Sequence, residues 1–264
     1  MNHLLRELAL VPSSGWEVIE SEARARLQTA LGARRLVDFS GPHGWSRSVA
    51  DLGRVEPLEG PGERVGASRR RVLPYVELRT GFELSRRELD ATERGARDVD
   101  LSGLEEAALR IAVAENSLVF QGYQAAGVTG VVEATAHAAL ELGGVEHYPR
   151  SVARAVEALR REGIGAPYGL AAGPDSYTAI IETAEHGGHL LLDHLRTILG
   201  GPVVWCPGLQ GAVVVSMRGG DFVLEVGQDL SIGYQDHDTG TVRLYLEESL
   251  AFLVLEPAAA VALR

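Results

Sequence analysis

The densest group of reactive side chains lies between residues 186 and 194. Its members are His186, Gly187, Gly188, His189, Asp193 and His194. Imidazole and carboxylate groups bind transition metals, so this segment is a candidate centre for a metal-dependent hydrolase. Its spacing matches no standard metal-binding motif, and the two glycines leave the geometry loose. A solvated loop is the favoured interpretation, and no metal site is predicted.

A second candidate is Asp238-Thr239-Gly240, which resembles the active-site triplet of an aspartic peptidase. That chemistry needs two such aspartates sharing a proton, and the sequence contains one triplet with polar flanks. We therefore expect a tight turn between two strands, with a peptidase as the alternative.

Other enzyme chemistries lack the residues they need. All 25 basic residues are arginine, which excludes a Schiff base, a P-loop lysine and a lysine-based isopeptide cross-link. Residues 165–169 carry Pro167 and Tyr168, which would obstruct a dinucleotide-binding loop. No Gly-x-Ser-x-Gly motif of a hydrolase is present. The residues themselves identify no catalytic site and no cofactor site.

Charge and composition narrow the possible partners. The 264 residues include 36 acidic and 25 basic side chains, giving a net charge of −11, which argues against a general nucleic-acid binder. Cys206 is the only cysteine, so an intrachain disulfide is excluded and a reducing, cytoplasmic setting is expected. The first ten residues include Arg6 and Glu7 and do not resemble a signal peptide. No apolar run approaches the roughly 18 residues of a membrane helix.

Helical periodicity predicts the elements that would position any site. The expected helices cover 14–31, 102–124, 151–162, 175–185 and 190–199. Ser14, Ser85 and Ser102 each stand three residues before a glutamate, a pattern that predicts capping boxes. The apolar stripe of the first helix is expected to pack on its own domain, and the long second helix could form a spine.

Strands are expected mainly in the last third of the chain. The predicted strands are 203–205, 212–217 and 222–226. Residues 218–221, with two glycines, predict a hairpin turn between the last two. Alternation over 242–254 slips at Glu247-Glu248, which predicts either a pair of strands or one bulged strand. Helices and strands mix without a regular βαβ period, so the fold class is α+β.

Residues 51–84 form a long polar excursion. Proline and glycine are frequent up to residue 71, and apolar residues then alternate with polar ones up to residue 84. Two extended arms around a flexible tip are too polar to bury a core. The segment is either a disordered surface loop or an arm that pairs with a neighbouring subunit.

Three stretches of sequence together resemble one protein family. They are Arg34–Trp45, Glu88–Gly95 followed by Val99–Leu101, and Gly219–Phe222 leading into Gly227–Tyr234. Over essentially its whole length the chain is similar to the shell proteins of family 1 encapsulins, the linocin-like group.

The resemblance implies the fold of tailed-phage major capsid proteins. Its expected parts are an N-terminal helix with the start of the peripheral domain (1–50), an extended loop (51–84), the peripheral domain with its spine helix (85–131), an axial domain (132–218) and the C-terminal strands of the peripheral domain (219–264). It further implies a protein that is not an enzyme and that assembles with itself, commonly as sixty copies, into an icosahedral nanocompartment in the cytoplasm. Neither nucleic acid nor membrane is an expected partner.

The resemblance also implies that the shell encloses a cargo enzyme, either a dye-decolourising peroxidase or a ferritin-like protein. The cargo enzyme is bound through a targeting peptide at its own C-terminus. The matching peptide-binding positions are Leu27, Arg34, Asp38, Leu230, Ile232 and Tyr234. The leucines and isoleucine would bury small apolar residues of the peptide, and Arg34 and Asp38 would pair with its charged tail. The alternative is that Leu230 and Ile232 are ordinary core residues.

Two further expectations follow from the resemblance. The loop His186-Gly187-Gly188-His189 is expected at the five-fold pore, where protonated histidines would repel one another and widen the opening. A loop that lines a fixed opening is the alternative. Some relatives stack a flavin on a tryptophan just before the Glu-Leu-Asp string, but Arg87 stands there in this chain, so no cofactor is expected.

Overall fold

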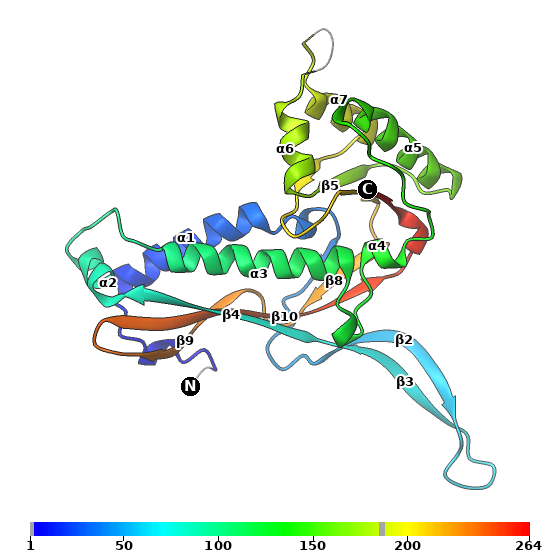
Figure 1. Ribbon diagram of the computed structural model, residues 1–264. Helices are drawn as coiled ribbons and strands as arrows, with labels where there is room; N and C mark the ends of the chain where they lie inside the picture. Colours follow the sequence, from blue (N-terminus) through cyan, green and yellow to red (C-terminus); the bar gives the residue numbers. More distant parts are fainter. Residues whose placement is uncertain (1–2, 185–187) are drawn as a thin grey trace.

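A long helix and a five-stranded sheet form the centre of the computed structural model, which describes residues 3–184 and 188–264 (Figure 1). The helices are α1 (Ser13–Ala30), α2 (Arg86–Glu93), α3 (Ser102–Gln121), α4 (Val131–Ala134), α5 (Tyr148–Arg161), α6 (Pro174–Glu182) and α7 (Leu191–Leu199). Short 3-10 turns are η1 (Arg6–Leu8), η2 (Ala33–Arg35), η3 (Gln124–Ala126), η4 (Val145–His147) and η5 (Pro257–Ala259). The expected helix ends agree with these to within three residues.

Two sheets and one two-stranded ribbon account for the strands. They are β1 (Asp38–Ser40), β2 (Val49–Leu58), β3 (Ala67–Pro74), β4 (Val76–Ser85), β5 (Tyr168–Ala172), β6 (Val203–Trp205), β7 (Ala212–Ser216), β8 (Phe222–Val226), β9 (Ser231–His237), β10 (Thr241–Val254) and β11 (Ala260–Leu263). The central sheet has the order β1-β8-β10-β4, with β9 paired to β10. The second sheet has the order β11-β7-β5-β6. This mixture of mainly antiparallel sheets and helices is the predicted α+β class.

The spine is α3, which lies beside α1 and across β4 (Figure 1). Leu104, Ile111 and Leu118 lie on its apolar face and are buried, as their helical spacing predicts. Two polar residues, Glu115 and Asn116, are also fully buried on this helix. A buried polar group needs a partner, so these two residues indicate where α3 is joined to the rest of the chain by polar contacts.

Asn116 joins α3 to the end of α1. Its Nδ2 donates to the carbonyl oxygens of Ala30 and Pro207, and its Oδ1 accepts from the backbone nitrogen of Ala33. The Ala30 carbonyl belongs to the last turn of α1 and accepts a second hydrogen bond, at 2.9 Å, from the Gly32 nitrogen. Immediately after it, a Cβ added at Gly32 would lie 2.5 Å from the Sγ of Cys206. The chain therefore leaves α1 through a close backbone approach that glycine permits.

The second sheet shares its apolar core with one end of the central sheet, including Phe222, Leu224 and Phe252. The strands β5 and β7 are buried along their whole lengths, and α5 and α7 pack on this sheet. In Figure 1 this part lies above the spine helix. The strands β5 and β7 stand at the two ends of the segment 168–216 and pair with each other. The final strand of the chain, β11, returns to pair with β7.

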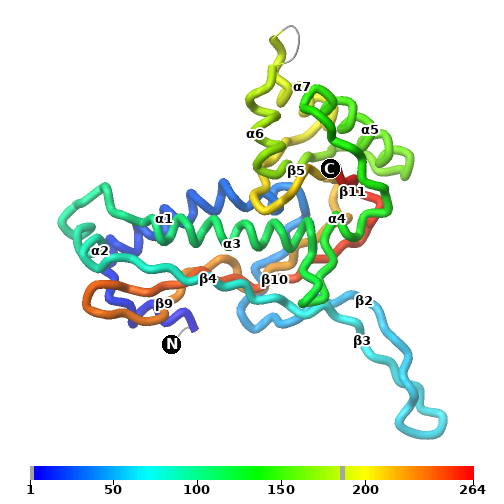
Figure 2. The backbone as a smooth tube through the Cα atoms, in the orientation of Figure 1, coloured from blue at the N-terminus to red at the C-terminus, as the bar shows by residue number. Residues whose placement is uncertain are grey.

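The ribbon of β2 and β3 extends away from the body of the subunit (Figure 2). The two strands pair only with each other in the described part of the chain, and most of their residues are exposed. The segment is therefore ordered as an extended arm rather than a disordered loop. Residues 76–85, by contrast, form β4 and pair with β10 in the central sheet.

The predicted helix caps are wrong in their hydrogen bonds. Ser14 lies inside α1, where its hydroxyl contacts that of Thr92 at 2.8 Å. Ser85 precedes α2 and Ser102 begins α3, yet neither side chain caps a backbone nitrogen. The carboxylate of Asp100 instead accepts from the Ser102 nitrogen at 3.0 Å. The motif identified where these three helices start, but a side chain bonds a nitrogen at the helix start only at α3, and that side chain is Asp100.

Two strand predictions also need correction. Residues 218–221 do not close a hairpin, because β7 and β8 belong to different sheets and this turn carries the chain from one to the other. Of the two alternatives for the tail, the single strand is confirmed as β10, but the expected irregularity at Glu247-Glu248 is wrong, because β10 pairs in unbroken register with β4 there. The register shift on its other side lies opposite β9 at Arg243 and Leu244. Glu247 and Glu248 are adjacent and both buried, so β10 is covered on both faces at this point. The break in the alternation of apolar and polar residues therefore reflects burial on both sides of the strand.

Within residues 3–184 and 188–264, no helix combines the length and apolar character needed to cross a membrane.

Candidate functional site

A cavity of about 600 Å³ lies between α1 and the start of β9, and four of the six predicted peptide-binding residues line it. These four are Leu27, Arg34, Leu230 and Ile232. The other lining residues are Leu4, Arg6, Glu20, Ala23, Arg24, Gln28, Leu31, Asp229, Ser231 and Leu246. A larger hollow, about 980 Å³, lies near the end of α3 and β11 and contains none of the predicted residues. We call the first cavity the groove.

The floor of the groove is apolar. Ala23 and Leu27 of α1 and Leu31 directly after it recur at four-residue spacing, so they lie on one side of the helix, and all three are buried. Ile232 on β9 is also buried, whereas Leu230 just before it is half-buried. Ile232 therefore belongs to the core, as the alternative interpretation proposed, while also lining the groove. Leu230 is the more accessible of the two residues.

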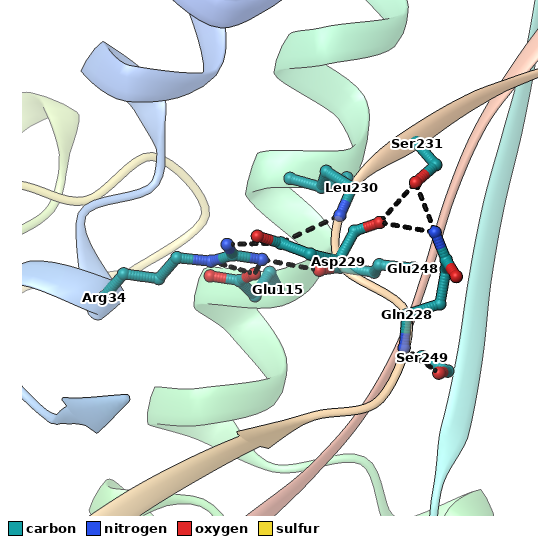
Figure 3. Close-up of polar contacts among 8 residues, drawn as sticks. All are labelled: Arg34, Glu115, Gln228, Asp229, Leu230, Ser231, Glu248 and Ser249. Carbon is teal, nitrogen blue, oxygen red and sulfur yellow. Dashed lines mark hydrogen bonds and ion pairs between the residues drawn. The ribbon is translucent and has the colours of Figure 1, made fainter. Parts of the chain in front are cut away.

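Arg34 lines the groove and binds three carboxylates (Figure 3). Its guanidinium lies 2.6 Å from Glu115 of α3, 2.7 Å from Asp229 and 2.8 Å from Glu248 of β10. The side chains of Glu115 and Glu248 are fully buried, and that of Arg34 is 16% exposed. Because these elements are far apart in sequence, one arginine ties η2, α3, β10 and the loop before β9 together.

The buried carboxylates of this cluster are not fully compensated. Burial raises the pKa of Glu248 well above its usual range, and the neighbouring Glu115 raises it further, while Arg34 acts in the opposite direction. Burial alone would lower the pKa of Arg34, but the charges of Glu115, Glu248 and Asp229 outweigh it and raise that pKa. One oxygen of each buried glutamate lacks a hydrogen-bond partner.

Hydrogen bonds hold the loop that presents Leu230. Asp229 accepts from the Leu230 backbone nitrogen at 2.8 Å through the same oxygen that contacts Arg34. The Gln228 nitrogen donates to the Ser249 hydroxyl at 2.8 Å, and its side chain donates to Ser231 (Figure 3). The loop is thus fixed at both ends, so Leu230 is held over the groove.

The segment before α1 forms a wall that sequence reasoning missed. The Leu4 carbonyl accepts from the Tyr234 nitrogen at 2.8 Å, which adds this segment to the edge of β9. His3 contacts Glu247 at 2.8 Å and stacks on Trp45 at a centroid distance of 4.0 Å. No local motif marks these residues, because their partners are more than 40 positions away in the sequence.

The other two predicted residues lie outside the set that lines the groove. Asp38 begins β1, and its carboxylate accepts from the Gly220 nitrogen at 2.5 Å, where it fixes the turn before β8. Tyr234 is half-buried on β9, and its hydroxyl hydrogen-bonds to His237. Both residues therefore have structural contacts of their own.

The remaining candidates have different surroundings. His186 and Gly187 lie outside the described residues; Gly188 and His189 are described and exposed or open to space. Asp193 contacts Arg196 at 3.6 Å. In the part of the chain that the structure describes, no three metal-binding side chains converge.

Asp238 occupies the predicted turn, between β9 and β10. Its carboxylate accepts from the nitrogens of Gly240 and Thr241 at 2.8 and 2.9 Å. The bond from Gly240 and the pairing with Arg243 lower the pKa of Asp238. Such a carboxylate stays ionised, whereas a peptidase pair shares a proton. The turn interpretation is confirmed.

Comparison with solved structures defines the class of protein. The virus-like particle from Pyrococcus furiosus matches with a TM-score of 0.64 and 19% identity over 94% of this chain and 98% of its own. The capsid of an empty GTA particle matches with a TM-score of 0.55 and 16% identity over 88% of this chain and 89% of its own. This chain therefore has the fold of capsid proteins, as predicted.

Sequence relatives identify the family within that class. The family described as encapsulating protein for peroxidase, Linocin_M18, matches residues 1–251. The type 1 encapsulin shell protein of Rhodospirillum rubrum is 45% identical over this whole chain and 97% of its own length. The type 1 encapsulin shell protein of Rhodococcus erythropolis is 40% identical over the full length of both chains. The chain belongs to the family of type 1 encapsulin shell proteins.

Proposed function

We propose that this protein assembles with copies of itself into a closed, hollow, icosahedral shell of sixty subunits that encloses a cargo enzyme. The observation that carries the proposal is the full-length similarity to type 1 encapsulin shell proteins at 40–45% identity. Shell proteins act through assembly, so the subunit itself is not an enzyme. The compartment would lie in the cytoplasm, with neither nucleic acid nor membrane as a partner.

The arm supports assembly. Val55, Leu58 and Val65 are exposed apolar residues on or beside the β2–β3 ribbon. A ribbon of two strands is marginally stable alone, and its outer edges carry unpaired backbone groups. A second subunit that covers these residues and edges would stabilise the arm. Without lysine, the shell would be held by such buried interfaces rather than by isopeptide bonds.

The groove supports binding of a cargo peptide. Each well-buried aliphatic contact contributes roughly 1.5–3 kcal/mol, whereas an exposed ion pair contributes about 0.2–1 kcal/mol. The apolar floor around Leu27 and Leu230 would therefore supply most of the affinity, and charges at the rim would set the register of the peptide. The peptide would be the C-terminal tail of a dye-decolourising peroxidase or a ferritin-like protein; the family description, an encapsulating protein for peroxidase, favours the first.

The domain roles follow from the same proposal. Residues 51–84 would serve as the extended loop, 85–131 and 219–264 as the peripheral domain, and 132–218 as the axial domain. The loop around residues 186–189 would then line the five-fold pore. If its histidines gate that pore, entry of a small substrate should increase as the pH is lowered from about 8 to about 5, because the histidines become protonated and repel one another. Entry that is unchanged across this range would leave the loop as the lining of a fixed opening.

Assembly is tested by electron microscopy and size-exclusion chromatography of the purified chain at neutral pH. Hollow, roughly spherical particles of megadalton order are expected even without cargo. A population that contains only monomers and dimers would contradict the shell function.

Cargo binding is tested by co-expressing the shell with a reporter that carries the tail of its cargo enzyme. Leu230→Asp should abolish loading while particles still form, because Leu230 is half-buried and lines the groove. Ile232→Asp is a poorer probe, because Ile232 is 5% exposed and a charge there would disturb the core. Normal loading of Leu230→Asp particles would place the binding site elsewhere.

A further inference from the structure

The charges around the groove are unequally available to a ligand. Five charged residues line it: Arg6, Glu20, Arg24, Arg34 and Asp229. Arg34 and Asp229 contact each other, and Arg34 also holds the buried Glu115 and Glu248. A guanidinium drawn away from two buried carboxylates would leave them uncompensated, so Arg34 is not available to a passing peptide.

Arg6 and Glu20 also have partners. The Arg6 guanidinium forms an ion pair with the Glu20 carboxylate and lies over the Trp16 ring, 4.1 Å from its centroid. These contacts join the wall segment to α1. The charge of Glu20 is balanced by that of Arg6, so this pair adds no unbalanced charge to the groove.

Arg24 differs from the other four residues. It is exposed, and among residues 3–184 and 188–264 it makes no ion pair or hydrogen bond. It lies four residues after Glu20 and three before Leu27 on α1, so these side chains share one helix face. The face that supplies the apolar floor therefore also presents an unpaired guanidinium at the rim of the groove.

We propose that Arg24 recognises a carboxylate of the peptide that docks in the groove, next to the aliphatic side chain that fills the apolar floor. This inference rests on the proposed function and specifies the ligand: an extended peptide with an aliphatic residue and a nearby acidic group. A guanidinium presents a planar fork of donors that matches a carboxylate in bidentate geometry. The carboxylate is supplied by an aspartate or glutamate, or by the end of the peptide chain.

Arg34 then has a different role from the one that the resemblance assigns to it. It is a positioning residue, because it holds the loop that presents Leu230 through Asp229. The subunit carries a net charge of −11, yet the unpaired charge at the groove is positive. The groove would therefore select acidic tails, although the net negative charge of the whole subunit repels them.

The test uses a pooled library. A fluorescent protein with eight randomised C-terminal residues is co-expressed with the complete shell chain, the particles are purified, and the retained tails are identified by mass spectrometry. The shell variants are wild type, Arg24→Gln, Arg24→Glu and Arg26→Gln. Arg26 is a matched control, because it lies on the same helix, carries the same charge and pairs with Glu22 and Glu105 outside the groove lining.

Wild-type particles should retain tails with an aliphatic residue, and acidic tails should be enriched over basic ones by about 1.5- to 5-fold, the range of one exposed ion pair. Arg24→Gln should remove this charge preference, Arg24→Glu should reverse it, and Arg26→Gln should leave it unchanged. A second library, extended by Gly-Ser-Gly, moves the chain end away. An acidic preference that persists there identifies an acidic side chain, and one that disappears identifies the terminal carboxylate.

The outcomes separate this inference from the proposed function. Aliphatic tails retained without an acidic preference, or a preference that survives in Arg24→Gln, would overturn the role of Arg24 and leave the groove in place. Well-formed particles that retain no tail above the starting pool would overturn peptide docking itself. Electron microscopy of each variant confirms that loading is compared between intact particles.

Discussion

The arm and the groove use the same pair of chemical groups in opposite surroundings. In the arm, Arg69 lies 2.5 Å from Glu56, and their side chains are 67% and 40% exposed. Beside the groove, Arg34 contacts Glu115 and Glu248, whose side chains are fully buried. Water screens the first pair and is excluded from the second.

Burial therefore decides what an arginine–carboxylate contact does in this subunit. An exposed pair contributes little to folding and leaves its charges available to a neighbouring molecule. A buried pair contributes little net stability when intact, but the loss of one partner is costly because the other charge is left uncompensated. This contrast supports the two proposed roles, an arm that meets a neighbouring subunit and a groove that keeps its shape before a peptide binds.

The largest effect is expected from removing the arm. Deletion of residues 57–70 takes away the tip of the β2–β3 ribbon, whose strands pair with no other strand in the described part of the chain. Electron microscopy should show that particles are lost, and circular dichroism should show that the remaining subunit keeps its secondary structure. Particles in normal yield would mean that the arm is not an assembly element.

Arg34→Ala should cause the next largest effect. It leaves two buried carboxylates without their cation, so the free energy of unfolding should fall by about 3–5 kcal/mol, measured by denaturant titration. Arg34→Ala combined with Glu248→Gln should recover part of the loss, because it removes one uncompensated charge. A loss below about 1 kcal/mol in the single variant would show that water reaches the cluster.

Glu248→Gln should change how stability depends on pH. The pKa of Glu248 is raised in the folded state, so its stabilising contribution is fully present below its ordinary pKa of 4.5 and is lost as the pH rises through the raised value. The stability of wild type relative to Glu248→Gln should therefore decline from pH 5 to pH 9. A relative stability that instead rises over this range would reverse the sign of the shift. Thermal unfolding of both proteins at matched pH measures the difference.

Arg69→Ala should have the smallest effect on the subunit. Its exposed pair with Glu56 contributes only about 0.2–1 kcal/mol. Thermal unfolding of the variant should therefore stay close to wild type, in contrast to Arg34→Ala. A destabilisation as large as that of Arg34→Ala would remove the distinction between the two regions.

The periodicity of apolar residues predicted the positions of the helices well, because the buried faces of α1 and α3 follow the repeat that any helix must have. It predicted less well which strands pair with each other. The turn at 218–221 has the composition of a hairpin, but which strands pair depends on the whole chain, and β7 and β8 lie in separate sheets. The cap predicted at α3 failed for a related reason: Asp100, which lies outside the motif, binds the nitrogen of Ser102.

The candidate groove was predicted in outline through the resemblance rather than from patterns of residues. Leu27 and Leu230 are 203 positions apart, so no local pattern joins them. The buried acids did leave signals: Glu115 interrupts the apolar stripe of α3, and Glu248 sits where the alternation of β10 slips. Each signal was ambiguous alone, because the cation that explains both comes from a third segment, at Arg34.

The close packing of Cys206 against Gly32 gives the subunit an internal reporter. The thiol is fully buried, and burial raises its pKa to about 12, so in the folded subunit it stays protonated and shielded from alkylating reagents. Because it is the only thiol in the chain, the rate at which a maleimide reacts with it measures how often the junction between α1 and the second sheet opens. Labelling kinetics on intact particles would therefore follow the breathing of each subunit without any engineered probe.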